Sequence, residues 1–214
     1  MTRDARPARS DPATPAGLAD LVRRIAPWDD RERDHLASAA AWIASGAPLY
    51  RTGKPDIPAT HLVSYFVVLN EDRGQLLLVD HRKARLWLPT GGHVEEGEDP
   101  WLAVVREARE ELTMQAEPSA LAGDRPFFLT VTRTRGPRQH TDVSLWYLLR
   151  TDATTVISYD EAEFAAIRWL TPPQVLAEPV DTLDPHLHRF TEKLLAAGFT
   201  ASPSAATDRT PASR

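Results

Sequence analysis

No cysteine occurs among the 214 residues of the chain. This absence excludes disulfide bonds, thiolate metal sites, iron–sulfur clusters and a cysteine nucleophile. Long apolar runs are also missing: the most hydrophobic stretches, such as Phe66–Leu69 and Leu76–Val79, are far shorter than a membrane span. The N-terminal arginines precede no apolar segment of the kind that signal peptides contain. We therefore expect a cytoplasmic protein with no membrane partner.

An excess of basic residues is missing as well. The chain has 25 lysines and arginines against 30 aspartates and glutamates, which gives a formal net charge of −5 at pH 7. Proteins that bind the nucleic-acid backbone generally present a basic surface, so we expect no nucleic-acid partner. Hydrophobic residues make up 42% of the chain and charged residues 26%, which is the composition of an ordinary globular protein.

Both ends of the chain are poor in apolar residues and rich in proline, alanine, serine and threonine. Such segments cannot offset their ordering entropy by burial, so the sequence predicts disordered tails at residues 1–16 and 200–214.

A helical pattern follows the first tail. Asp29 and Glu32 form a capping-box pattern at the start of a second helix. The first helix is indicated by apolar residues at helical spacing, namely Leu18, Leu21, Val22 and Ile25. We predict an N-terminal helical extension over residues 17–48. It would pack on the main domain or on a partner, and it is a candidate for a homodimer interface or for a lid over the site.

From His61 onward the pattern becomes rich in β-branched and aromatic residues, which is typical of strands. Strands are predicted over residues 61–69, 75–80, 127–134, 141–150 and 165–170. Helices are predicted over residues 100–114, 175–177 and 185–197. Strands of this kind with interspersed helices predict an α/β or α+β sandwich, with the main domain over residues 58–199.

The segment with the clearest chemical signal is Gly91–Met114, in which a glycine pair precedes a helix that carries clustered acids. Glu107, Glu110 and Glu111 share one side of this helix, because residues three and four apart are neighbours on its surface. Clustered carboxylates repel one another unless a positive charge lies among them, and oxygen ligands suit a hard cation such as Mg²⁺ or Mn²⁺. The alternative is a solvated charged helix in which nearby arginines pair with these acids.

Residues upstream of the helix lie at fixed spacing from it. Gly92 is followed after five residues by Glu98, and seven more residues lead to Arg106 and the run REAREELTM. This pattern resembles the Nudix box, G-x5-E-x7-REUxEExGU, in which U is a bulky aliphatic residue. The departure is Thr113, where the family has glycine. A β-branched residue resists the positive φ that glycine supplies there, so we expect a longer helix or a different exit turn.

The resemblance implies a Nudix fold, an α/β/α sandwich with a mixed β-sheet. It also implies an Mg²⁺-dependent hydrolase, with Mn²⁺ as a substitute, that cleaves the diphosphate linkage of a nucleoside diphosphate joined to a group X. The substrate would be a small-molecule nucleotide, either a nucleoside triphosphate or another nucleotide derivative. The intact glutamates argue against the competing hypothesis, a catalytically idle Nudix-fold module that binds or senses a nucleotide.

The resemblance also assigns roles to residues of the box. The metal ligands and catalytic carboxylates would be Glu107, Glu110 and Glu111, with the Gly92 carbonyl as a further metal ligand. Glu98 and Arg106 would orient the helix carboxylates through ion pairs.

The general base is either a box glutamate or an acid of the later loop that precedes the strand at residues 165–170. Related enzymes often place a further glutamate there, and Glu163 is favoured over Asp160 and Glu161. A solvated loop acid is the competing interpretation of Glu163.

Two groups of cations are candidates for contacts with the substrate, the first with its phosphates and the second with its phosphates or its base. The first lies between the second strand and the box and contains Arg82, Lys83 and Arg85. The second surrounds a predicted turn and contains Arg133, Arg135, Arg138 and His140. Solvated turns are the alternative for both groups. Of the adjacent Trp146 and Tyr147, we expect one in the core and the other free to stack on a base.

Overall fold

The computed structural model describes residues 11–53, 57–134, 139–152 and 158–200. Residues 1–10 and 201–214, which make up most of the two predicted tails, lie outside the described residues, and so do Arg135 and Arg138.

The strands and helices lie close to the predicted bounds. The strands of the described part are β1 (Thr60–Asn70), β2 (Gln75–His81), β3 (Leu86–Leu88), β4 (Thr90–His93), β5 (Phe128–Arg133), β6 (Thr141–Thr151) and β7 (Phe164–Leu170). The helices are α1 (Pro15–Arg23), α2 (Asp30–Ala44), α3 (Pro100–Leu112), α4 (Pro172–Ala177) and α5 (Leu187–Ala196), with a 3₁₀ turn at Val180–Thr182. The short strands β3 and β4 are not predicted from the sequence. No helix of the described part is long and apolar enough to cross a membrane.

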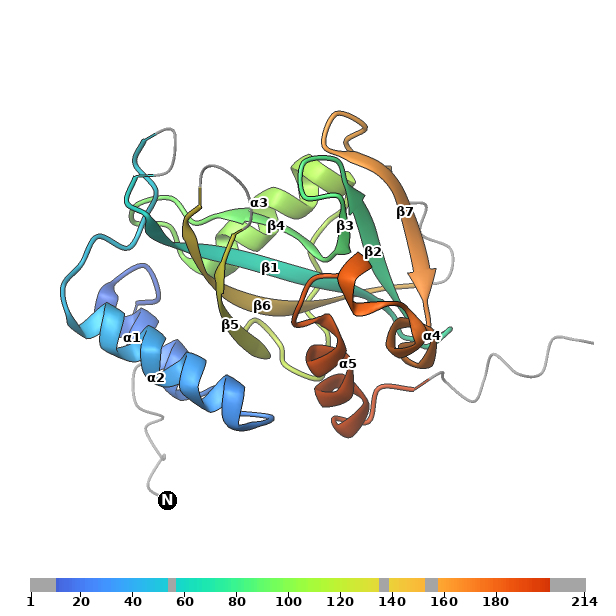
Figure 1. Cartoon of the computed structure of the whole chain (residues 1–214), viewed down its shortest axis with the longest axis horizontal. Coiled ribbons are helices and arrows are strands. Elements are labelled where there is room, and N and C mark those ends of the chain that lie inside the picture. The colour runs from blue at the N-terminus through green and yellow to red at the C-terminus, as the bar shows by residue number, and fades with distance from the viewer. Residues whose placement is uncertain (1–10, 54–56, 135–138, 153–157, 201–214) are drawn as a thin grey trace, which may run out of the picture.

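The strands form one mixed sheet with the order β3-β2-β1-β6-β5, in which β4 pairs with β1 and β7 pairs with β2. The central pair, β1 and β6, is parallel from Thr60↔Thr141 to Asn70↔Thr151, and the other pairs are antiparallel. Helix α3 lies on one face of the sheet and helices α4 and α5 lie on the other (Figure 1). The predicted α/β/α sandwich with a mixed sheet is therefore confirmed.

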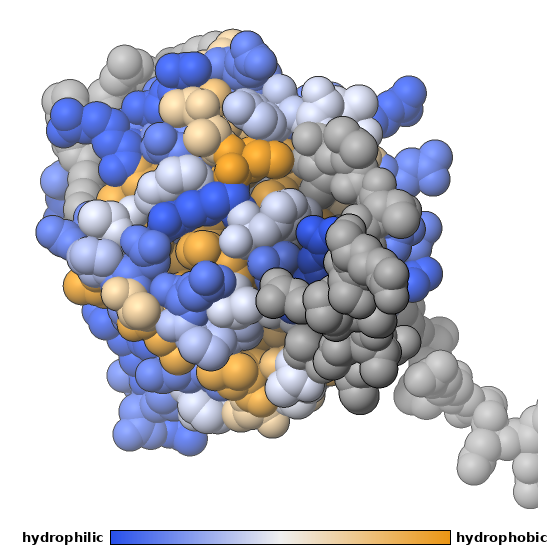
Figure 2. All heavy atoms as spheres, turned by 90° about the vertical axis from the view of Figure 1, so that its right-hand side faces the viewer, coloured by the Kyte–Doolittle hydropathy of each residue, from blue (hydrophilic) through white to orange (hydrophobic). Residues whose placement is uncertain are grey.

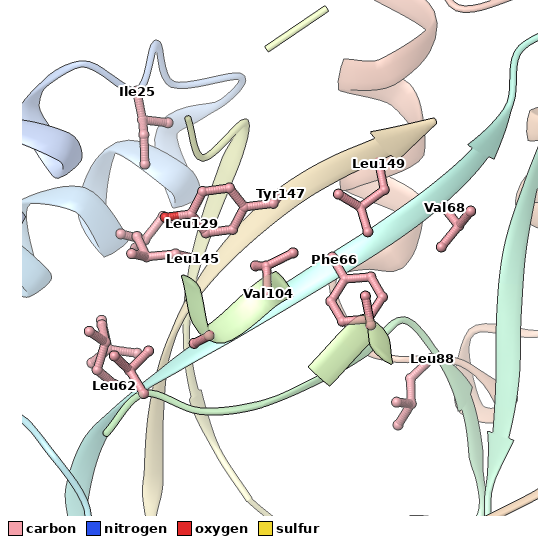
Figure 3. Packing of buried hydrophobic residues seen from close by; sticks show 14 of the residues in the cluster. Ile25, Leu62, Phe66, Val68, Leu88, Val104, Leu129, Leu145, Tyr147 and Leu149 are labelled. Carbon is pink, nitrogen blue, oxygen red and sulfur yellow. The ribbon is translucent and has the colours of Figure 1, made fainter. Parts of the chain in front are cut away.

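Two hydrophobic cores lie on opposite faces of the sheet, because successive strand side chains point in opposite directions. Phe66 and Tyr147 belong to the core under α3, and Figure 3 shows Val104 of this helix beside them. Val67 and Trp146 belong to the core under α4 and α5. Both Trp146 and Tyr147 are fully buried, so the expectation that one of them stacks on a substrate base is wrong. The sheet is covered on both sides at this point.

The surface beyond these cores is mixed. Figure 2 shows the side of the molecule that lies at the right of Figure 1, where hydrophobic areas are small and separated by hydrophilic side chains.

Helix α2 packs against β5 through a buried glutamate. Asp29 caps the helix by accepting a hydrogen bond from the Glu32 backbone N–H at 2.7 Å, as the capping-box pattern predicts. The Glu32 carboxylate is fully buried and accepts from the backbone N–H groups of Trp28 and of Leu129 in β5. Lys193 of α5 donates to both oxygens of this carboxylate at 2.9 and 3.0 Å. One side chain therefore joins α2, β5 and α5.

Helix α3 ends at Leu112, and Thr113 adopts a left-handed conformation with φ of 51°. The backbone N–H groups of Thr113 and Met114 both point to the carbonyl of Ala108 and close the last turn. Both sequence expectations for this position are wrong: the helix does not continue, and the exit turn has the geometry that glycine usually provides. The threonine bears conformational strain of roughly 1–2 kcal/mol there.

We expect Glu32→Gln to lower the free energy of unfolding by about 3 kcal/mol, because Lys193 would lose its buried counter-charge. For a chain of this size that loss lowers Tm by roughly 6–12 °C in thermal unfolding. The double variant Glu32→Gln/Lys193→Met should recover part of the loss, since it removes the unpaired charge. Asp34→Asn, on the exposed side of the same helix, is the matched control. An equal loss in the single and double variants would contradict the role of the pair.

Thr113→Gly should raise the free energy of unfolding by up to about 1 kcal/mol, because the relief of strain exceeds the entropy that glycine adds to the unfolded chain. Ala37→Gly, at an exposed interior position of α2, should instead lower it by about 1 kcal/mol. Thermal unfolding of both variants measures the contrast, and a loss of stability in both would show that Thr113 is not strained.

Candidate active site

The site begins at the close approach of β4 to β1 and α3. Strand β4 pairs with Val63–Phe66 of β1. Gly91 has a φ of 146°, and a Cβ at this position would overlap the backbone carbonyl of Ser64. A Cβ on Gly92 would overlap the Glu107 carboxylate. The glycine pair therefore lets the helix carboxylate lie directly on the backbone of β4.

The first turn of α3 is held in place by two hydrogen bonds. Asp99 caps the helix and accepts from the backbone N–H of Trp101 at 2.9 Å. The buried hydroxyl of Ser64 in β1 donates to the carbonyl of Pro100 at 2.9 Å. These contacts set the position of the helix, and with it the positions of its glutamates.

Glu111 is almost completely buried at the start of β4. Its Oε2 accepts hydrogen bonds from the Thr90 hydroxyl and from the backbone N–H of Gly91. Burial, together with the negative charges of Glu107 and Glu163, raises the pKa of Glu111 to about 9. In the metal-free protein this carboxyl therefore keeps its proton at neutral pH.

Arg106 connects the glutamates of the box. It donates to Glu98 at 3.1 and 3.0 Å, to Glu107 Oε1 at 2.6 Å and to the carbonyl of His93 at 3.0 Å. Burial raises the pKa of Glu107 even though Arg106 acts in the opposite direction. The ion pairs with Glu98 and Glu107 raise the pKa of the guanidinium, so Arg106 stays charged.

These groups open onto a pocket of about 460 Å³. Five of the residues singled out from the sequence as catalytic or metal-binding line it: Gly92, Arg106, Glu107, Glu111 and Glu163. The loop acid Glu163 and the box acids Glu107 and Glu111 therefore line one cavity, although some fifty residues separate them in the chain. Asp160 is not among the lining residues, and its backbone N–H donates to the carbonyl of Glu111 at 2.9 Å.

Other predicted site residues lie outside the pocket lining. Glu98 lies behind Arg106, and the Glu110 side chain is 62% exposed and 3.8 Å from Arg106. Arg82 donates through Nε to the carbonyl of Glu161. Arg85 occupies the turn between β2 and β3, and Arg133 is an exposed residue at the end of β5. The cations that line the pocket besides Arg106 are Arg51 and Lys83.

The pocket also contains residues that sequence reasoning does not single out, among them Arg51, Tyr65, His81 and Asp142. Asp142 is aligned with His61 by the parallel pairing of β1 and β6. Since the two residues are about eighty positions apart in the chain, only the strand register brings them together. The proximity of His140 and Asp142 in the sequence is the one signal that points to this part of the pocket.

The donor set fits a hard divalent cation. Glu107 and Glu111 supply carboxylate oxygens beside the backbone of β4, and each has a pKa raised by burial and by its acidic neighbours. Such a cluster is unfavourable when ionised without a positive charge between its members, and oxygen-only ligands suit Mg²⁺ or Mn²⁺.

A cavity lined by carboxylates from a helix and a distant loop and by cations suits an enzyme that acts on phosphate anhydrides. The family model of the NUDIX domain matches residues 60–194, which is more than half of the chain. The chain therefore belongs to the Nudix hydrolase family, and it is a pyrophosphohydrolase.

Solved structures agree with the fold. A hydrolase of the NUDIX family from Clostridium perfringens is 23% identical, with a TM-score of 0.50, over 64% of this chain and 97% of that chain. The MutT protein from Methanosarcina mazei Go1 is 16% identical, with a TM-score of 0.53, over 66% of this chain and 96% of that chain. At this level of identity the likeness concerns the fold alone.

The raised pKa of Glu111 predicts a pH-dependent stability of the metal-free protein. Between the ordinary value of 4.5 and about 9, the folded state keeps this proton while the unfolded state has lost it. The folded state then binds more protons than the unfolded state, so this group lowers the free energy of unfolding as pH rises. We expect Glu111→Gln to raise Tm by a few degrees at about pH 8 and to change it little at about pH 4.

Thermal unfolding in the presence of a chelator, over a series of pH values, measures this difference. Glu117→Gln is the matched control, because Glu117 forms an exposed ion pair with Arg150. A difference between wild type and Glu111→Gln that does not change with pH would contradict the buried, protonated state of Glu111.

Proposed function

We propose that this protein hydrolyses the diphosphate linkage of a nucleoside triphosphate or a related nucleotide derivative in an Mg²⁺-dependent reaction. The observation that carries the proposal is the meeting of Glu107, Glu111 and Glu163 in one pocket whose rim carries Arg51 and Lys83. A polyphosphate needs positive charge along its length, and the carboxylates alone would repel it.

Mg²⁺, when bound by these carboxylates, neutralises phosphate charge and stabilises the leaving phosphate. Glu107 and Glu111 would hold it, together with the backbone carbonyl of Gly92, and Glu110 is a further candidate from the same helix face. Arg106 and Glu98 act as positioning residues, since their ion pairs hold the Glu107 carboxylate against β4. The absence of nitrogen and sulfur donors from this set favours Mg²⁺ or Mn²⁺.

In the reaction, water attacks one phosphorus of the diphosphate, the bond from that phosphorus to the bridging oxygen breaks, and the other phosphate leaves with this oxygen. A base must take the proton of the attacking water. Glu163 is the proposed base: its side chain hydrogen-bonds with that of Glu111, and its negative charge raises the pKa of both Glu107 and Glu111. Lys83 lies 3.8 Å from Glu163 and can contact phosphate from the same side.

Arg51 and Lys83 are proposed as the cations that bind the substrate phosphates, because they line the pocket. Arg82, Arg85 and Arg133 remain candidates for contacts with substrate outside it. The cytoplasm, which supplies nucleotides and millimolar Mg²⁺, is the proposed location, and a homodimer through the N-terminal helices is the proposed assembly. We propose no nucleic-acid or membrane partner, in line with the acidic net charge.

The test is incubation of the purified protein with a panel of nucleoside triphosphates, oxidised nucleoside triphosphates and nucleoside diphosphates linked to other groups, with and without Mg²⁺. Mass spectrometry identifies the products. We expect cleavage between two phosphates that requires Mg²⁺, and a loss of kcat of at least about 100-fold in Glu111→Gln. Glu163→Gln should lower kcat more than it changes KM, and its effect should be smallest at high pH, where hydroxide needs no base.

Glu117→Gln is again the matched control, since its exposed ion pair lies at the far end of β6. Turnover that is unaffected by a chelator, or by Glu111→Gln, would contradict the proposed use of the carboxylates.

A further inference from the structure

A second polar cluster borders the same pocket as Glu111, and it contains two histidines and an aspartate rather than glutamates. His61 Nε2 and His140 Nε2 lie 3.2 and 3.3 Å from the same oxygen, Oδ1 of Asp142. The ligand atoms of these three side chains all lie within 4.8 Å of one another. Asp142 lines the pocket together with His93, so the cluster opens onto the same cavity.

The register of the strands explains why the cluster forms. His61 in β1 is directly opposite Asp142 in β6, and residues in register point to the same face of the sheet. His140 lies two residues before Asp142 and therefore shares that face. His93 in β4 is opposite Val63 on the other side of β1, and its Nε2 lies 3.1 Å from His61 Nε2.

In both histidines, the Nδ1 nitrogen lies within hydrogen-bond distance of another group. His61 Nδ1 lies 2.9 Å from the carbonyl oxygen of Pro58, and because a carbonyl only accepts, this nitrogen carries the hydrogen. In the neutral ring, Nε2 then carries no hydrogen, and it lies 3.2 Å from Asp142 Oδ1 and 3.1 Å from His93 Nε2. His140 Nδ1 lies 3.2 Å from the hydroxyl of Thr134. Histidines that bind a metal commonly anchor their second nitrogen in this way, which fixes the tautomer and the ring orientation.

The Asp142 carboxylate, at the centre of the cluster, lacks a well-formed hydrogen bond to one of its oxygens. Its Oδ1 is buried and has no hydrogen-bond partner of good geometry among the described residues, although two imidazole nitrogens lie close to it. A buried carboxylate oxygen without such a partner is costly. A cation placed between the three ligand atoms would satisfy it.

The spacing of the ligand atoms fits a tetrahedral ion. Metal–ligand bonds of about 2.0–2.1 Å at tetrahedral angles separate neighbouring ligand atoms by about 3.3 Å. The two nitrogen–oxygen separations, 3.2 and 3.3 Å, are already of this size. Two nitrogens and one carboxylate oxygen suit Zn²⁺, whereas Mg²⁺ prefers oxygen ligands alone.

We propose that His61, His140 and Asp142 form a binding site for Zn²⁺ or a similar nitrogen-preferring divalent ion, separate from the carboxylate site on α3. Three protein ligands leave the fourth position of a tetrahedral ion to water or to a phosphate oxygen. This site goes beyond the proposed hydrolysis and does not depend on it. A protonated His61 paired with Asp142 is the competing arrangement, and it needs no metal.

The proposal is tested by equilibrium dialysis of the full chain, without a purification tag, against micromolar Zn²⁺ in millimolar Mg²⁺, so that the carboxylate site is supplied with its own ion. We expect one Zn²⁺ per chain for the wild type. His140→Ala and Asp142→Asn should each weaken zinc binding at least about 10-fold. Glu111→Gln should keep it, because Glu111 belongs to the other site.

His188→Ala is the matched control for the loss of a histidine, since His188 lies on α5 and contacts the carbonyl of Val175. His140 is only partly buried, so its variant should fold, which circular dichroism checks. Zinc should raise Tm of the wild type and of His188→Ala but not of His140→Ala.

Failure of the wild type to retain zinc would overturn the proposal in favour of the protonated pair. The proposal would also be overturned if His140→Ala and Asp142→Asn bound zinc as tightly as the wild type does, or if Glu111→Gln were the one variant that lost zinc. Because none of these measurements uses turnover, they stay separate from the test of the hydrolase activity.

Discussion

The close packing of α3 on the glycine strand β4 is the constraint on which the site depends. A side chain at Gly92 would occupy the place of the Glu107 carboxylate, and one at Gly91 would overlap β1. Because Ser64 of β1 also holds the first turn of α3 through the carbonyl of Pro100, strand and helix cannot shift independently. The rigid core of the sheet thereby fixes the positions of the glutamates.

This packing has an electrostatic cost. Glu107 and Glu111 lie out of water and next to Glu163, so their pKa values rise and the metal-free site holds at least one proton on Glu111. Arg106 offsets part of the repulsion at Glu107, and Lys83 lies 3.8 Å from Glu163, yet the pKa values of Glu107 and Glu111 remain raised. A divalent cation bound there would displace the proton, so cation binding and proton release are coupled. Metal affinity should accordingly increase with pH.

The parallel pairing of β1 and β6 sets the other end of the pocket. It places His61 opposite Asp142, which lines the same pocket as Glu107 and Glu111. Two donor sets of different chemistry on one cavity can select different ions, since affinity follows ligand type. The N-terminal helices are fixed to the same sheet through Glu32, whose contacts with Leu129 and Lys193 join three elements.

Local spacing in the sequence was enough to predict α3, its three glutamates and the longer strands, because a helix surface and a strand face repeat over a few residues. It was also enough to identify the Nudix family and the α/β/α sandwich. Tertiary structure alone decided that Glu163 meets Glu111, that Glu110 points away, and that Asp142 lies beside His61. It also placed Thr113 in a left-handed conformation and buried both Trp146 and Tyr147. Except for the conformation of Thr113, which local hydrogen bonds to Ala108 accompany, these outcomes depend on contacts between residues far apart in the chain, and such contacts produce no periodic pattern in the sequence.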